Sequence, residues 1–153
     1  LETEGKECPT GPWDPVIDFM TKEAKRTGRA GGGGFYEYPE NEKKYLWPDL
    51  EKHFHPSDNQ VSQDEMMDRF YFAQAVETIR CYEEGVLTSV ADANIGSILG
   101  WGFPSFKGGT LQFVKDYGIV PFRDRAQELA EKYGDHFAPP KLLLDMAESG
   151  ENF

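Results

Sequence analysis

The residues best suited to bind a metal or to take part in catalysis are three histidines and two cysteines. His53 and His55 are two positions apart, whereas His136 stands far along the chain. A zinc site needs about four ligands at characteristic spacings, and Cys8 and Cys81 are both distant from this histidine pair. We therefore predict no metal site, and a polar linker as the place of the two neighbouring histidines.

A run of four glycines, Gly31 to Gly34, is the second candidate. A phosphate-binding loop needs a strand before it and a helix after it. Here a predicted helix precedes the run, and an extended aromatic segment, residues 35–38, follows it. We predict a tight turn without a bound cofactor, and we expect Phe35 and Tyr36 to be buried where the segment folds back on the helical domain.

The sequence also offers no candidate for a catalytic serine or cysteine nucleophile. No serine stands in the G-x-S-x-G pattern of hydrolases, and neither cysteine has a histidine close to it in sequence. We therefore predict no catalytic residue in this chain. Two cysteines alone fit reduced thiols better than a disulfide framework. No transmembrane stretch and no signal peptide is visible, which favours a cytoplasmic location.

The charge of the chain narrows its partners. Sixteen basic and 27 acidic side chains give a net charge of −11 over 153 residues. Nucleic acids and anionic membranes are poor partners for such a chain, because phosphate contacts require clustered lysine and arginine. The apolar share of 39% nevertheless suffices for a globular core.

Helix signals dominate the C-terminal part of the sequence. Ser62–Glu65 and Ser89–Asp92 both have the pattern of a capping box, in which a serine and a carboxylate cap a helix start reciprocally. The pattern predicts about five helices from Ser62 onward and no strand, hence an all-α compact domain. Apolar residues expected on the buried face of its first helix are Met66, Phe70, Ala73, Val76 and Ile79.

Glycine and proline mark the other boundaries. The second helix carries Ala91, Ile95, Ile98 and Leu99 and should stop at Gly100. Pro121 and Pro140 should open the last two helices. An arm with one helix, whose N-cap is Asp14, and the glycine-rich aromatic segment precede the domain. We place the arm at residues 1–55 and the domain at residues 60–153.

Three segments together resemble the C-terminal helical region of the 3-hydroxyacyl-CoA dehydrogenases, in the multifunctional alpha-subunit type of fatty-acid oxidation protein. The first resembles the element that closes one helical repeat, the second the opening helix of the next repeat, and the third the loop after that helix. These segments are Thr27–Tyr38, Asp68–Gly85 and Ala91–Gly109.

The resemblance implies that residues 1–55 are the tail of a first helical repeat and residues 60–153 a second repeat. It implies a parent NAD-dependent oxidoreductase of β-oxidation, in which an imidazole base removes the hydroxyl proton while hydride passes to NAD. The family's dinucleotide fingerprint and catalytic histidine are absent, and His53-Phe54-His55-Pro56 and His136-Phe137-Ala138-Pro139 are each one residue short of the histidine motif. The isolated chain should therefore be inactive.

The resemblance also assigns Asp68, Arg69, Phe103 and Pro104 to a substrate cleft. The family has an asparagine where this chain has Asp68. Because an ionised aspartate cannot donate a hydrogen bond, Asp68 cannot hold the substrate as a donor in the way that the family's asparagine can.

Two hypotheses stay open for the chain itself. In the first, it supports the cleft for an acyl-CoA substrate and packs against an upstream nicotinamide-binding domain and the first repeat. In the second, it is a helical interaction module for dimerisation or for docking a thiolase subunit, without substrate contact. The first residue is Leu1 and not methionine, which favours a piece of a longer protein.

Overall fold

The computed structural model describes residues 11, 13–55, 57–58 and 60–153. The chain divides into two compact units, residues 1–60 and 61–153. Cys8 and Pro56 lie outside the described residues, as does the rest of the polar segment before Gly11. No helix of the described part is both long and apolar enough to cross a membrane.

The N-terminal unit consists of short elements. The first helix begins at Asp14, and Trp13 is its N-cap, so the expectation that Asp14 is the N-cap is wrong by one position. The Asp14 carboxylate instead accepts a hydrogen bond from the Gly11 amide at 2.9 Å. In chain order the elements are α1 (Asp14–Asp18), a π-helix (Phe19–Glu23), a 3-10 turn (Arg29–Gly31), β1 (Tyr36–Glu37), β2 (Tyr45–Leu46) and α2 (Leu50–His53).

The glycine run forms a closed turn, as the sequence predicts. Gly28 and Gly33 pair across the turn, and the two following strands are antiparallel, with Tyr36 opposite Leu46. Arg26 fastens the turn, because its Nε atom donates to the Gly34 carbonyl at 2.7 Å.

Within the N-terminal unit, Phe35 and Tyr36 are both more than a third exposed. Their burial against the helical domain stays a prediction. Tyr36 lies in β1 and Phe35 directly precedes it. The strand β1 pairs with β2 alone, in a two-stranded ribbon.

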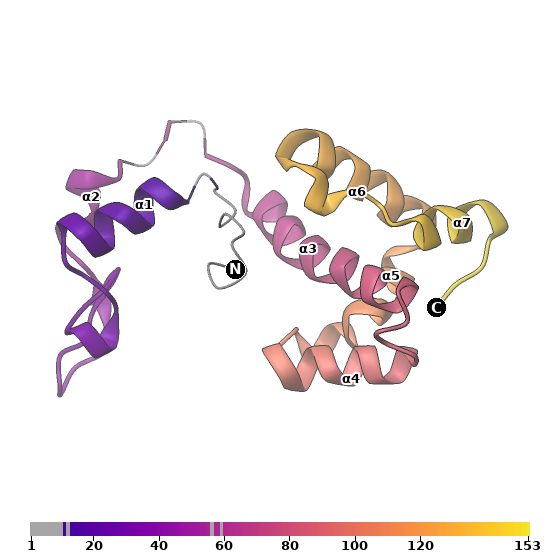
Figure 1. The fold of residues 1–153 in the computed structure, drawn as a ribbon, viewed down its shortest axis with the longest axis horizontal. Helices are drawn as coiled ribbons and strands as arrows, with labels where there is room; N and C mark the ends of the chain where they lie inside the picture. The colour runs from indigo at the N-terminus through magenta and orange to yellow at the C-terminus, as the bar shows by residue number, and fades with distance from the viewer. Residues whose placement is uncertain (1–10, 12, 56, 59) are drawn as a thin grey trace, which may run out of the picture. The chain divides into compact units, whose positions relative to one another are not determined.

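The C-terminal unit is all helical in its described residues, which confirms the predicted fold class. Figure 1 shows α4 and α6 on opposite sides of α3. Its five α-helices match the predicted number, and short 3-10 turns join some of them. They are α3 (Gln63–Glu83), α4 (Val90–Trp101), α5 (Thr110–Tyr117), α6 (Ile119–Tyr133) and α7 (Lys141–Ser149).

The core of this unit is aromatic at its centre. Phe72 of α3 stacks on Phe122 of α6 with ring centroids 4.2 Å apart, and both rings are fully buried. Phe113 and Tyr117 of α5 contact both rings edge-on. This arrangement is a favourable one for aromatic pairs, and it joins three helices at one point.

Two predicted helix faces are shifted. On α3 the buried apolar residues are Phe72, Ala75, Val76 and Ile79, whereas Phe70 and Met66 are exposed. Bulky apolar residues occur all round this helix, so that the periodicity alone cannot select one stripe. On α4 only Ala93 and Ser97 are buried, and Ile95 and Leu99 face solvent.

The serine caps form as the sequence predicts, whereas the predicted end of a helix at Gly100 and the predicted opening of a helix at Pro121 are wrong. Ser62 and Ser89 accept from the amides of Glu65 and Asp92, at 3.2 and 3.3 Å. The α4 helix passes through Gly100 and stops at Gly102, which has a left-handed conformation. Pro121 does not open its helix, because α6 begins two residues earlier at Ile119. Pro140, by contrast, directly precedes α7.

The reciprocal half of the first capping box is replaced by a tertiary contact. Oε1 of Glu65 accepts hydrogen bonds from Lys132, at 2.8 Å, and from the hydroxyl of Tyr133, both on α6. These hydrogen bonds hold the pKa of Glu65 below its usual value. The carboxylate therefore links α3 to α6, where the sequence pattern predicts a bond back to its own helix.

Candidate functional site

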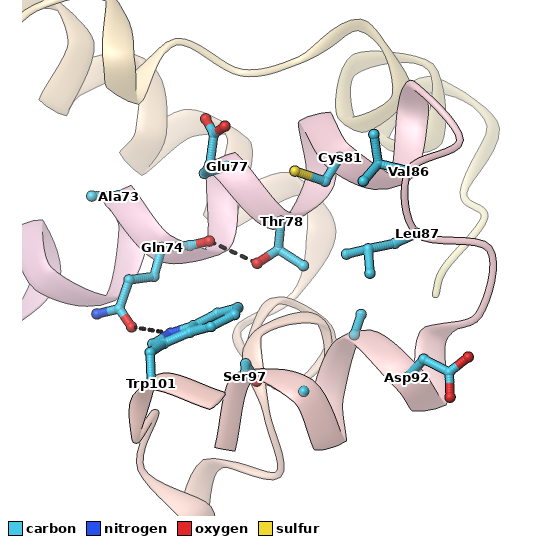
Figure 2. A pocket seen from close by; sticks show the side chains of 12 residues that line it. Ala73, Gln74, Glu77, Thr78, Cys81, Val86, Leu87, Asp92, Ser97 and Trp101 are labelled. Carbon is cyan, nitrogen blue, oxygen red and sulfur yellow. Dashed lines mark hydrogen bonds between the residues drawn. The ribbon is translucent and has the colours of Figure 1, made fainter. Parts of the chain in front are cut away.

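An apolar groove runs between α3 and α4, with a volume of about 570 Å³ (Figure 2). It exists because α4 makes its main contacts with α5. Three of the α4 residues that line the groove are small, namely Ala93, Gly96 and Ser97. The groove is lined by Ala73, Gln74, Glu77, Thr78, Cys81, Val86, Leu87, Asp92, Ala93, Gly96, Ser97 and Trp101.

Trp101 forms one end of the groove in a fixed orientation. Its indole Nε1 donates to Oε1 of Gln74 at 2.8 Å, and Nε2 of Gln74 donates to the Phe70 carbonyl at the same distance. Val86 and Leu87, in the connection between α3 and α4, lie at the opposite end (Figure 2). The indole remains more than half exposed, so it offers an oriented apolar surface to a ligand.

The charged residues of the groove lining are both acidic. Glu77 and Asp92 line it, and no lysine, arginine or histidine does. The Glu77 side chain has one ion pair, with Arg80 at 3.3 Å, and is still 66% exposed. Asp92 lies in the first turn of α4 and forms no ion pair with the described residues. The groove therefore presents an apolar floor with negative charge beside it.

Cys81 contributes a half-buried thiol to the wall of the groove. It is a free cysteine, and Cys8, the other cysteine, lies outside the described residues. No group of three or more histidine, cysteine, aspartate or glutamate side chains in the described part is arranged to hold a metal ion.

A second, smaller pocket of about 320 Å³ has the opposite charge. Arg69 and His136 line it together with Met66, Phe70, Ala73 and Phe137. The Arg69 guanidinium lies 4.2 Å from the centre of the Tyr133 ring, a favourable cation–π distance. None of the described carboxylates forms an ion pair with it. The pocket therefore combines an apolar wall with a positive charge that has no anionic partner in the described chain.

Asp68 points away from this pocket. Its carboxylate accepts from Nε of Arg125 on α6 at 2.9 Å, in a partly buried ion pair. The hydrogen bonds that Arg125 donates to the carboxylates of Glu128 and Asp68 raise the pKa of its guanidinium. Asp68 therefore joins α3 to α6. An ionised carboxylate can play this structural role because it needs only to accept hydrogen bonds.

Phe103 and Pro104 lie in a different place from Arg69. Phe103 is 2% exposed and packs in the core against Tyr71 and Phe113. Pro104 precedes the 3-10 turn Ser105–Lys107. The four predicted cleft residues therefore do not line one common site. Among them, Arg69 lines the second pocket.

The glycine run cannot cradle a phosphate in this conformation, because its amides are already bonded. The amides of Gly31 and Gly33 donate to the Gly28 carbonyl, that of Gly32 to Arg29, and that of Gly34 to Tyr36. A nucleotide-binding turn needs such amides free to point at the ligand. The glycine turn therefore does not offer free amides to the phosphates of a nicotinamide cofactor.

Comparison with known proteins identifies relatives along most of the chain. No protein-family model matches it. A protein named fatty acid oxidation complex subunit alpha from Vibrio vulnificus (strain CMCP6) is 32% identical over 139 residues. One of the same name from Pseudomonas savastanoi pv. phaseolicola (strain 1448A / Race 6) is 34% identical over 145 residues. Each match covers 90% of this chain, and the chain spans about a fifth of the length of either relative.

Proposed function

The chain belongs to the family of the fatty acid oxidation complex alpha subunits, and from this premise we propose that it is a non-catalytic, C-terminal helical part of such a protein. The similarity along 90% of the chain carries the proposal. The parent would be an NAD-dependent 3-hydroxyacyl-CoA dehydrogenase of β-oxidation in the cytoplasm. This chain would support its substrate cleft and pack against its upstream domains.

The distribution of polar groups supports a role without catalysis. A general base must reach the proton that it removes and needs a partner that orients it. In the described residues no histidine forms an ion pair with a carboxylate. His53 packs between Phe19 and Trp47, and His136 packs on Phe137. These contacts are typical of histidines that pack against aromatic rings and have no catalytic role.

The pocket beside Arg69 supports the cleft role. An acyl-CoA combines an apolar chain with phosphate groups, and an unpaired guanidinium next to an apolar wall complements both parts. The second pocket has these two features within α3 and the segment after α6. The groove between α3 and α4, with its acidic lining, favours instead the second hypothesis, a surface for docking another polypeptide.

Catalytic silence is the direct consequence of this proposal. The purified chain, mixed with acetoacetyl-CoA and NADH, should oxidise NADH no faster than the same protein after boiling, because it holds neither the cofactor turn nor an oriented base. Absorbance of NADH checks this. Oxidation that saturates with acetoacetyl-CoA and disappears on boiling would contradict the proposal.

A further inference from the structure

We propose that the pocket beside Arg69 binds the nucleotide end of coenzyme A (CoA), the adenosine that carries a 3′-phosphate, and leaves the acyl chain outside. The cleft role proposed above is the premise of this assignment. If the chain binds an acyl-CoA, the size, the charge and the side chains of this pocket decide which part of the molecule enters it.

The size of the pocket admits only part of an acyl-CoA. Its volume of about 320 Å³ lies at the lower end of the range for ligand pockets, about 300–1,000 Å³. An acyl-CoA consists of an acyl chain, a long pantetheine arm and a nucleotide with phosphate groups at the 3′ and 5′ positions of its ribose. One of these parts can fill the pocket while the others remain outside it.

The hydrogen bonding of Arg69 distinguishes between these parts. No described residue accepts a hydrogen bond from its guanidinium or forms an ion pair with it. The other arginines of the C-terminal unit all donate to oxygen atoms of the protein; they are Arg80, Arg123 and Arg125. The five N–H donors of Arg69 are therefore available to a ligand.

Arg69 is nevertheless held in place. Its guanidinium lies over the ring of Tyr133, 4.2 Å from the ring centre, and the hydroxyl of Tyr133 donates to Glu65. The Glu65 carboxylate, one helical turn before Arg69, is already paired with Lys132 at 2.8 Å. A guanidinium that is held by its face and keeps its N–H groups free is suited to a phosphate, which it binds through two parallel hydrogen bonds.

The acyl chain and the pantetheine arm are poorer occupants for this reason. An acyl chain offers no acceptor to Arg69 and would remove water from its guanidinium, and the burial of a charge without a partner costs free energy. The pantetheine arm offers neutral carbonyl oxygens, which accept weaker hydrogen bonds than a phosphate does. The 3′-phosphate brings both negative charge and several acceptor oxygens, which favours the nucleotide end.

Aromatic side chains beside Arg69 provide a surface for the adenine ring. Phe70 follows Arg69 on α3, lines the pocket and is 65% exposed. His136, which packs on Phe137 with ring centroids 4.1 Å apart, lines the same pocket. Nucleobases stack on exposed aromatic rings whatever their sequence, and an imidazole N–H can donate to a phosphate. The pocket therefore offers a stacking surface and a phosphate-binding group side by side.

The test compares CoA derivatives on the full chain by chemical-shift titration in NMR, which measures weak binding. Free CoA should bind with an affinity within about twofold of that of octanoyl-CoA, because the acyl chain stays outside. Dephospho-CoA, which lacks only the 3′-phosphate, should bind at least about tenfold more weakly, the effect of losing a charge-assisted hydrogen bond. Octanoyl-pantetheine, which lacks the nucleotide, should show no saturable binding.

Three variants locate the two parts of the nucleotide. Arg69→Met should bind CoA and dephospho-CoA with equal affinity, because the preference for the 3′-phosphate depends on this guanidinium. Phe70→Leu keeps the pocket apolar but removes the ring, and it should weaken CoA binding at least about threefold. Phe106→Leu is the matched control: Phe106 is also exposed but does not line the pocket, and this variant should bind CoA as the original chain does.

Equal binding of CoA and dephospho-CoA, or a preference that survives in Arg69→Met, would overturn the assignment of the phosphate to this guanidinium. Unchanged CoA binding by Phe70→Leu would remove the adenine from the pocket. Binding of octanoyl-pantetheine but not of free CoA would put the acyl chain there, and displacement of CoA by an equal concentration of inorganic phosphate would show an unspecific anion site. An acyl-CoA still binds in each of these cases, so the cleft role stands; absence of octanoyl-CoA binding contradicts that role itself.

Discussion

Replacing Gly109 with alanine should lower the free energy of unfolding of the C-terminal unit by about 3–5 kcal/mol, the sum of backbone strain and overpacking. Gly109 has a φ of +106°, and a Cβ at this position would lie 2.5 Å from the Cα and Cβ atoms of Asn94. Asn94 cannot retreat without cost, because its Oδ1 accepts from the amides of Leu111 and Gln112 at the start of α5. Urea denaturation followed by circular dichroism measures the effect.

Gly102→Ala is the matched control for this prediction. Gly102 also has a positive φ, but nothing lies within 4 Å of its Cβ position. Alanine there should therefore cost only the conformational strain, roughly 1–2 kcal/mol. If the two variants lost the same free energy of unfolding, the close approach of α4 to the start of α5 would not be important to this fold.

Replacing Phe72 with alanine should lower the free energy of unfolding by about 3–5 kcal/mol, as for other fully buried phenylalanines. The ring stacks on Phe122 and contacts Phe113 and Tyr117, so its removal opens a cavity where α3, α5 and α6 meet. Since small domains have a net stability of about 5–15 kcal/mol, the loss should be obvious in urea denaturation.

Phe70→Ala provides the comparison within the same helix. Phe70 is 65% exposed, and its removal should change the free energy of unfolding by less than about 0.5–1 kcal/mol. This pair of variants also tests the register of α3 directly. Equal losses for Phe70→Ala and Phe72→Ala would restore the face that the sequence pattern predicts, with Phe70 inside.

The sequence predicts the helices of the C-terminal unit well, because local chemistry decides where they begin and end. Ser62 and Ser89 cap helices through their own hydroxyls, an interaction that needs no distant partner. The choice of the buried face is different. It depends on which helices pack together, and on α3 this places Phe72 inside and Phe70 outside, although both are equally apolar.

The candidate site is less accessible to sequence reasoning for the same reason. The groove arises because α4 packs on α5 and leaves a space beside α3, a tertiary arrangement that no motif encodes. The indole of Trp101 is oriented by Gln74, 27 positions earlier. The sequence did contain one indication of the groove. Apolar residues occur all round α4, and these are more than a helix with a single buried face needs. Of the predicted cleft residues, Phe103 is part of the hydrophobic core, whereas Arg69 lines an open pocket.

Titration of the chain with octanoyl-CoA tests the cleft role most directly. Isothermal titration calorimetry should show saturable, weak binding, with a Kd on the order of 0.1–1 mM. Arg69→Met should weaken it about tenfold, because a charge-assisted hydrogen bond contributes roughly 1.5–3 kcal/mol. Arg123→Met, which removes an arginine paired with Asp124, and Gly96→Leu should bind as the original chain does. No saturable binding, or equal binding by Arg69→Met, would contradict the cleft role and leave the chain as a docking module.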